Sequence, residues 1–334
     1  MKSIYKYMFS IPIGCMLLGF LSCSDDKTEG EANPHPVILK AEVFTAGNET
    51  GTVWNSGQSL GVYMLKNGTR EIAGEHANLK FLADNRGTTG YLVPADNVPV
   101  YYPEDGTKVD FRVYYPYDEK IRTRSQDLHQ TEVVITAKTK ADALLYSDNS
   151  LGNDGSGRPT VQLKSMLSAV KMDMHCDMEE AASITATIRN TAIRAVFDVI
   201  EGKFVKRTLE EGSPLQLTAS RQTSTSTSGY IFTLQATLFS GVMEEGAEIE
   251  IEVKDKAGKV IKTYQPAKLR KVLDLGKDNV AEENTQYEID GQLNAGSENI
   301  TTQVAAKTQI VIQKWNGNDD SAIGGIARPE RKQK

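Results

Sequence analysis

The chain has 334 residues, with 38 Lys and Arg against 44 Asp and Glu, and its formal net charge at neutral pH is −6. An acidic balance of this kind disfavours nucleic acid and anionic membrane surfaces as partners. The length is enough for about two domains.

Residues 1–23 have the features of an export signal. Two lysines precede the apolar run Met8–Leu21, which is too short to span a bilayer comfortably. The run is followed by Ser22 and Cys23, and a small residue before Cys at this place resembles the cleavage site of bacterial lipoproteins. We therefore expect Cys23 to be the acylated first residue of the mature chain. An ordinary signal peptide that is cut nearby is the alternative.

The residues after Cys23 support a surface location. Ser24–Asp26 is acidic and resembles the surface-export signal of Bacteroidetes lipoproteins. Several acyl chains on one Cys would anchor the protein durably, so we expect an outer-membrane, surface-exposed lipoprotein. Residues 24–36 are polar and contain proline, which is typical of a flexible tether.

Removal of the signal changes the charge and the cysteine count. It takes two lysines and no acidic residue, which leaves 36 basic against 44 acidic residues and a net charge of −8. Of the 3 Cys, Cys15 leaves with the signal and Cys23 is expected to be acylated. Only Cys176 remains, so the mature chain can form no intrachain disulfide.

From Val37 onward, short apolar runs alternate with turn-forming clusters. Frequent short strands of this kind, without a long helical stripe, predict an all-β protein built of sandwiches or barrels. In chain order, the expected strands are Val37–Phe44, Leu60–Leu65, Val109–Tyr115, Val133–Ile135, Ala143–Tyr146, Val161–Leu163, Ala169–Met174, Ile184–Ile188, Ala195–Ile200, Tyr230–Leu238, Glu248–Val253 and Val260–Tyr264.

The segment Val100–Tyr117 carries the clearest strand signal. Its turn block, Pro103–Gly106, separates two apolar runs that are rich in tyrosine, and this pattern predicts a β-hairpin. After the turn, apolar side chains alternate with Asp110 and Arg112, which predicts one buried and one partly wet face. Pro116 has no N–H for a ladder bond, so the strand should end there or lie at an edge.

The stretch Ser147–Pro159 is a loop by composition and the best candidate for a domain boundary. It divides the mature chain into a tether, an N-terminal β-sandwich over residues 37–158, a C-terminal β-sandwich over residues 159–317 and a polar tail over residues 318–334. The loop at Ser220–Gly229 is interpreted as a long hairpin tip.

Residues that carry catalysis are not gathered into any known pattern. The 4 His are scattered, and the sequence has no HExxH, CxxC, Gly-x-Ser-x-Gly or P-loop motif. His175 and Cys176 are adjacent, so on a strand they would point to opposite faces and could not share a metal. We therefore expect no enzyme activity, no metal site and no cofactor.

Five motifs, in the same order along the chain, resemble those of the fimbrillin family, the subunits of type V pili in Bacteroidales. They include Trp54 and Gly61 of the first motif, Tyr114 and Pro116 of the second, and Trp315 of the last. The motifs are Trp54–Met64 (WNSGQSLGVYM), Val100–Tyr117 (VYYPEDGTKVDFRVYYPY), Asp142–Tyr146 (DALLY), Val161–Val170 (VQLKSMLSAV) and Ile310–Gly317 (IVIQKWNG). The two tryptophans are interpreted as core or groove anchors rather than sugar platforms.

The resemblance implies two tandem transthyretin-like β-sandwich domains and a structural or adhesive role as a pilus shaft, anchor or tip subunit. In that family, a protease that often cuts after Arg removes the first strand together with its lipid. A strand from the next subunit, commonly its C-terminal segment, then fills the groove. The implied partners are other pilus subunits, the outer membrane through the lipid, and a host or bacterial surface receptor.

Two segments of this chain suit those roles. Val37, Leu39, Ala41 and Val43 alternate in the expected first strand, which would be the one that leaves. At the other end, Val304, Ala306, Thr308, Ile310 and Ile312 form one small-to-apolar face, the candidate donor strand. The alternative for that second segment is the last strand of the C-terminal sandwich.

One departure concerns processing. No Arg lies between the first strand and Trp54, and the first Arg of the chain is Arg70. The chain is thus an anchor subunit that keeps its lipid, a subunit cut after Arg70 or a Lys, or a relative that does not polymerise. The alternative function is a glycan-binding outer-membrane lipoprotein, with Tyr101, Tyr102, Tyr114 or Tyr117 as stacking platforms.

Overall fold

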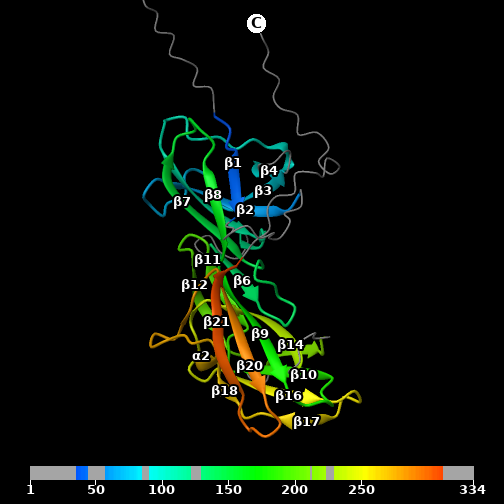
Figure 1. Ribbon diagram of the computed structural model, residues 1–334. Coiled ribbons are helices and arrows are strands. Elements are labelled where there is room, and N and C mark those ends of the chain that lie inside the picture. The colour runs from blue at the N-terminus through cyan, green and yellow to red at the C-terminus, as the bar shows by residue number, and fades with distance from the viewer. Residues whose placement is uncertain are drawn as a thin grey trace, which may run out of the picture. The chain divides into compact units, whose positions relative to one another are not determined.

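Strands make up most of the chain that the structure describes (Figure 1). The computed structural model describes residues 35–43, 57–84, 90–121, 129–210, 213–222 and 229–310. Its helical elements in these ranges are short, namely η1 (Ala95–Asn97) and α2 (Leu269–Val272). The all-β prediction is confirmed.

Seven strands form a closed sheet, called the closed sheet below. Their order around it is β1-β4-β3-β2-β5-β7-β8. They are β1 (Leu39–Val43), β2 (Ser59–Lys66), β3 (Leu79–Asp84), β4 (Gly90–Pro94), β5 (Val109–Tyr115), β7 (Leu145–Asn153) and β8 (Thr160–Ser165).

The inside of the closed sheet is an apolar core supplied by alternate residues of its strands. On β2, Leu60, Val62 and Met64 belong to this core, whereas Tyr63 and Leu65 belong to a second cluster outside it. Both faces of β2 are therefore covered, which explains why its side chains form an almost continuous apolar run rather than a clean alternation.

The remaining strands form four smaller sheets. Their orders are β13-β10-β16-β17 with β18 beside β16, then β12-β11-β6, β14-β9-β20-β21 and β15-β19. The strands are β6 (Gln130–Val134), β9 (Leu167–Cys176), β10 (Ser183–Arg189), β11 (Arg194–Asp198), β12 (Lys203–Thr208), β13 (Leu215–Ser220), β14 (Tyr230–Phe239), β15 (Gly241–Val242), β16 (Glu248–Lys254), β17 (Val260–Thr263), β18 (Ala267–Lys268), β19 (Val280–Ala281), β20 (Thr285–Leu293) and β21 (Thr301–Gln309).

These sheets bury one large apolar cluster together with outward-facing residues of the closed sheet, among them Tyr63, Tyr114 and Tyr146. Phe197 on β11, Phe232 on β14 and Ile249 on β16 are fully buried in it. The inward positions alternate with half-exposed residues along β9 and β16, as one-sided burial requires.

The predicted hairpin at Val100–Tyr117 is wrong. The turn is present, since Gly106 N–H donates to the Pro103 carbonyl at 3.2 Å. However, β5 pairs with β2 on one edge and with β7 on the other. The run before the turn pairs instead with the residues that lead into β1, through a bridge between Tyr101 and Pro36. The turn residues form the expected turn, but they do not decide which strand pairs with β5. Strands distant in sequence pair with both of its edges.

The loop expected at Ser147–Pro159 is also wrong over its first half, because β7 extends to Asn153. Ser147 and Asn149 are 3% and 4% exposed, so these polar side chains face the inside of the closed sheet. Strand pairing also crosses the expected boundary at residue 158. β8 pairs with β1 and β7, and β6 pairs with β11. Pro116 ends β5 as predicted.

Candidate functional site

The first strand lies between two neighbours in the closed sheet. β1 pairs antiparallel with β4, with Leu39 opposite Leu92, and parallel with β8, with Ala41 opposite Val161. Before the strand begins, Val37 N–H donates to the Val100 carbonyl at 2.8 Å. Removal of β1 would therefore leave two strand edges with unpaired backbone groups.

The side chains of β1 contribute directly to the core of the closed sheet. Val37, Leu39 and Ala41 are 1%, 0% and 2% exposed and belong to its apolar cluster. Val43 lies within β1, but its side chain is outside the described part. The departure of β1 would thus uncover an apolar groove with unpaired backbone groups along both edges. An added strand could fill the groove with its side chains and pair with both edges.

The candidate donor segment is an edge strand. β21 pairs antiparallel with β20 and stands at the end of the β14-β9-β20-β21 sheet. Val304 and Ala306 are half-buried and Thr308 is exposed. This position agrees with the alternative that β21 is the last strand of a C-terminal sheet, and it leaves the donor role open.

The last described residue joins β21 to the closed sheet. Ile310 is 5% exposed and packs in the apolar cluster of the closed sheet, and its N–H donates to the Asn284 carbonyl at 2.8 Å. Ile312 and Trp315 lie outside the described residues, as do Trp54 and the expected lipid-attachment residue, Cys23.

Two of the motif residues meet in the structure. Gly61 on β2 is opposite Tyr114 on β5, and a Cβ at Gly61 would overlap the Tyr114 ring. The ring is fully buried, and its hydroxyl donates to Asn78 Oδ1 at 2.7 Å and accepts from Asp118 N–H at 3.0 Å. Burial raises the pKa of the Tyr114 hydroxyl.

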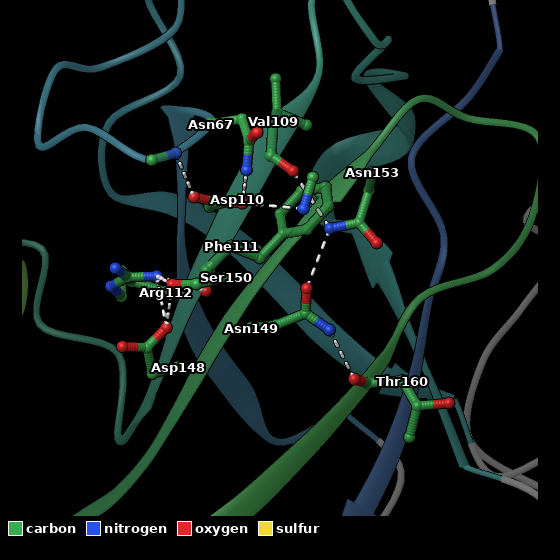
Figure 2. A network of polar contacts seen from close by, with 12 residues as sticks. Asn67, Val109, Asp110, Phe111, Arg112, Asp148, Asn149, Ser150, Asn153 and Thr160 are labelled. Atoms are coloured by element: carbon green, nitrogen blue, oxygen red, sulfur yellow. Dashed lines mark hydrogen bonds and ion pairs between the residues drawn. The ribbon is translucent and has the colours of Figure 1, made fainter.

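A buried aspartate organises the outer side of β5 (Figure 2). Asp110 is 1% exposed, and its Oδ1 accepts from Asn67 Nδ2 at 2.8 Å and from Gly152 N–H at 2.9 Å. Its Oδ2 accepts from Gly68 N–H at 2.8 Å. Three donors satisfy the carboxylate, which is what a buried charge needs in order to be tolerated.

Asp110 lies at a β-bulge. The register between β5 and β7 shifts here, so that the residues from Ser150 to Gly152 stand opposite Asp110 alone. Gly152 adopts φ 66°, a left-handed conformation that glycine enters without strain. The hydrogen bond from its N–H to Asp110 holds the bulge in place.

Beside the bulge, Arg112 is held by two side-chain acceptors on β7. Its Nη1 lies 2.6 Å from Asp148 Oδ1 and donates to Ser150 Oγ at 2.9 Å (Figure 2). Farther along, Asn149 Nδ2 donates to the Thr160 carbonyl of β8 at 2.7 Å. The expected partly wet face of β5 is wrong, because Asp110 and Arg112 are both covered.

The tyrosines proposed as sugar platforms do not form one exposed surface. Tyr114 is buried and Tyr102 is 6% exposed, with its ring against Phe111. Tyr101 is 38% exposed, and the half-buried Tyr117 ring faces Lys80 Nζ at 5.8 Å. Inward-pointing tyrosines fit a structural part of the fold better than a glycan platform.

The described residues show neither a metal cluster nor a membrane-crossing helix. Within the described residues, no group of three or more His, Cys, Asp and Glu is placed to hold a metal ion. No helix in the same ranges is long and apolar enough to cross a bilayer. Cys176 is a free, buried thiol, and burial raises its pKa.

Sequence reasoning missed the bulge and the network around Asp110. One signal was available, because an acidic residue inside the apolar run Val109–Tyr115 needs partners if it is buried. Those partners come from Asn67, Gly68 and Gly152, and nothing in a local pattern identifies them.

Comparisons with known proteins identify the family of this chain. The fimbrillin-like family model matches residues 45–315. A Bacteroides uniformis protein named as a fimbrium subunit, Fim1C, is 26% identical over 207 residues, which is 56% of this chain and 64% of that relative. The chain therefore spans less than two thirds of that relative's length.

Two solved structures share the fold. Both are described as cell adhesion proteins. The one from Bacteroides uniformis has a TM-score of 0.58 at 18% identity and covers 83% of this chain and 100% of its own. The one from Bacteroides ovatus has a TM-score of 0.57 at 14% identity and covers 85% and 98%. The family model extends over most of the chain, and the chain belongs to the fimbrillin-like family.

Proposed function

We propose that this protein is a structural or adhesive subunit of a type V-like pilus and assembles at the cell surface by β-strand exchange. The observation that carries the proposal is the position of β1. It is the first described strand, it pairs along both edges, and its side chains fill the core of the closed sheet. A strand near the chain start can leave without unthreading the fold.

The incoming strand is expected from another subunit. β21 is the candidate donor because it is an edge strand with a half-buried apolar face. Its role differs from that of β1, since β21 is bound on one side in the subunit and would be bound on two sides in a groove left by β1.

We also propose that the chain has the two transthyretin-like domains of the family. Strand pairing supports a boundary after Ser165 rather than after residue 158, because β8 pairs with β1 and β7. Conversely, β6 pairs with β11 and would belong with the C-terminal sheets.

Processing is the step on which the subunit type depends. Arg70 lies in the turn after β2, with its side chain 74% exposed. A cut there would remove β2 as well as β1, although β2 pairs with both β3 and β5. We therefore favour an anchor subunit that retains β1 over a subunit that is cut after Arg70.

The direct test places a specific protease site between Phe44 and Trp54. Cleavage of the purified mature chain should release β1 and allow polymers to form, as measured by light scattering and electron microscopy. A chain with the same site and a scrambled 301–310 segment is the control for the donor strand. Complete cleavage without any polymer would reject a shaft role and leave the anchor role that the position of Arg70 favours.

The lipid anchor is tested separately. Cys23→Ala should move the protein from the membrane fraction to the soluble fraction, because Cys23 is the residue expected to carry the acyl chains. Cys176→Ala is the matched control and should leave fractionation unchanged. Membrane association that survives Cys23→Ala would contradict the anchor.

A further inference from the structure

A cavity of about 730 Å³ opens beside β7 and β8. The two strands pair only at Leu145 with Ser165 and Tyr146 with Lys164, and they separate beyond these residues. The turn at Glu201–Gly202 and the side chain of Glu283 also line the cavity. Its volume lies within the range of small-molecule sites.

The rim of the cavity carries an unusually exposed apolar side chain. Leu151 is 79% exposed, the highest value among the large apolar residues of the described chain. It lies in the bulge that the buried carboxylate of Asp110 fixes through Gly152 N–H. Bulges re-aim side chains and are common beside binding sites, and Leu151 lines the cavity at this bulge.

One residue that lines the cavity has a buried hydroxyl without a partner in the described chain. Tyr146 is 4% exposed and lines the cavity, and its hydroxyl has no hydrogen-bond partner among the described residues. The hydroxyl lies against Gly202, since a Cβ there would be 2.9 Å from it. Burial raises its pKa, so it stays a neutral group that can both donate and accept.

The charges that line the cavity are already compensated. Asp148 is paired with Arg112, Glu283 with Lys164, and Glu201 with Lys203 and Arg70. An ionic ligand of either sign would find no free counter-charge in these pairs. Uncharged groups remain, including the exposed side-chain amide of Gln162.

A peptide strand is a poorer occupant of the gap. An inserted strand would require about 10 Å between β7 and β8, twice the normal strand spacing. The Asn149 side chain instead bridges the two strands, with Nδ2 2.7 Å from the Thr160 carbonyl.

We propose that this cavity binds a neutral mono- or disaccharide. An apolar sugar face would lie on Leu151, and sugar hydroxyls would bond to Gln162 and to the paired carboxylates of Asp148 and Glu283. Carboxylates accept hydrogen bonds from sugar hydroxyls, and an amide can both donate and accept. Because each carboxylate is already paired with a cation, the ligand need not carry a charge. The cavity shares β8 with the groove that β1 would leave, since Gln162 stands opposite Glu42 of β1. Sugar binding is measured on the uncleaved subunit and needs no polymer, so its failure would be distinguishable from a failure of strand exchange.

The test titrates the purified mature chain with glucose, galactose, N-acetylglucosamine, maltose and lactose, using calorimetry and saturation-transfer NMR. N-acetylneuraminic acid and glucosamine serve as charged counterparts. At least one neutral sugar should bind. Gln162→Leu should weaken its binding about tenfold, the effect of one lost hydrogen bond, and Leu151→Ser about threefold.

Val134→Ser is the control, because Val134 is also an exposed apolar residue, at 41%, and does not line the cavity. It should leave sugar binding unchanged, and circular dichroism should show that all three variants keep the wild-type fold. Absence of binding by every neutral sugar, tighter binding of a charged sugar, or binding that neither cavity variant weakens would overturn the proposal.

Discussion

Gly61 is the clearest case in which one residue type is dictated by a neighbour. The Tyr114 ring occupies the space where a side chain at this position would lie, and the ring is fixed by hydrogen bonds to Asn78 and Asp118. The aromatic ring can then cover β2 closely while keeping its hydroxyl paired.

Gly61→Ala is expected to destabilise the fold by about 3 kcal/mol, because the ring is held and cannot move aside. Urea unfolding, followed by circular dichroism, measures the loss. The cost should shrink in a Tyr114→Leu background, since the ring that causes the overlap is then gone. Equal costs in the two backgrounds would contradict this explanation.

Asp110 is the second residue on which the closed sheet depends. Asp110→Asn is expected to lower stability by about 3 kcal/mol. All three partners of the carboxylate are donors, so the side-chain NH₂ of the new asparagine would face a donor in place of an acceptor. Chemical denaturation measures the change. Asp278→Asn, at an exposed position, is the control and should leave stability unchanged.

At the scale of the strand, β1 and β21 differ in how many neighbours they have. β1 has partners on both edges, whereas β21 stands at the end of its sheet. Hydrogen exchange depends on whether each amide is bonded, so the two strands should be distinguishable in the intact protein.

The amides of Leu39–Val43 should exchange as slowly as those of β5, whereas alternate amides of β21 should exchange early. Hydrogen exchange followed by mass spectrometry and NMR measures both. Exchange of β1 at the rate of a free peptide would mean that the strand leaves the sheet spontaneously, which would remove the need for a proteolytic step.

The individual strands could be predicted from the sequence more easily than their partners. The period-2 pattern located β5, and Pro116 marked its end, because both signals are local. The pairing of β5 with β7 depends on contacts far along the chain. For the same reason, Ser147–Asn153 resembles a loop in composition although it is a strand, since its Ser and Asn side chains gain partners only in the folded sheet.

At the scale of the whole molecule, several tyrosines are buried in both apolar clusters. Tyr102 is almost fully buried, which raises its pKa to about 12, and burial also raises the pKa of Tyr114, Tyr146, Tyr264 and Tyr287. Each of these residues is protonated and neutral in the folded state at neutral pH.

Stability should therefore fall as the pH rises above about 10, the ordinary pKa of tyrosine in an unfolded chain. Above that pH the unfolded state releases protons that the folded state still binds, so the unfolded state is favoured. Urea midpoints measured across this range test the prediction, and Tyr102→Phe should reduce the slope. A midpoint that stays constant well above pH 10 would contradict it.

The two-sided pairing of β1 also determines how the protein responds to mechanical load. A pull on the chain before Val37 acts along the strand, so the hydrogen bonds to β4 and β8 resist it together, in shear. The inward side chains of Val37, Leu39 and Ala41 add further resistance, because the strand can leave only when they are pulled out of the apolar core. A subunit that keeps β1 is thus a firm attachment point, and one that has lost it transmits force only through whatever strand has taken its place.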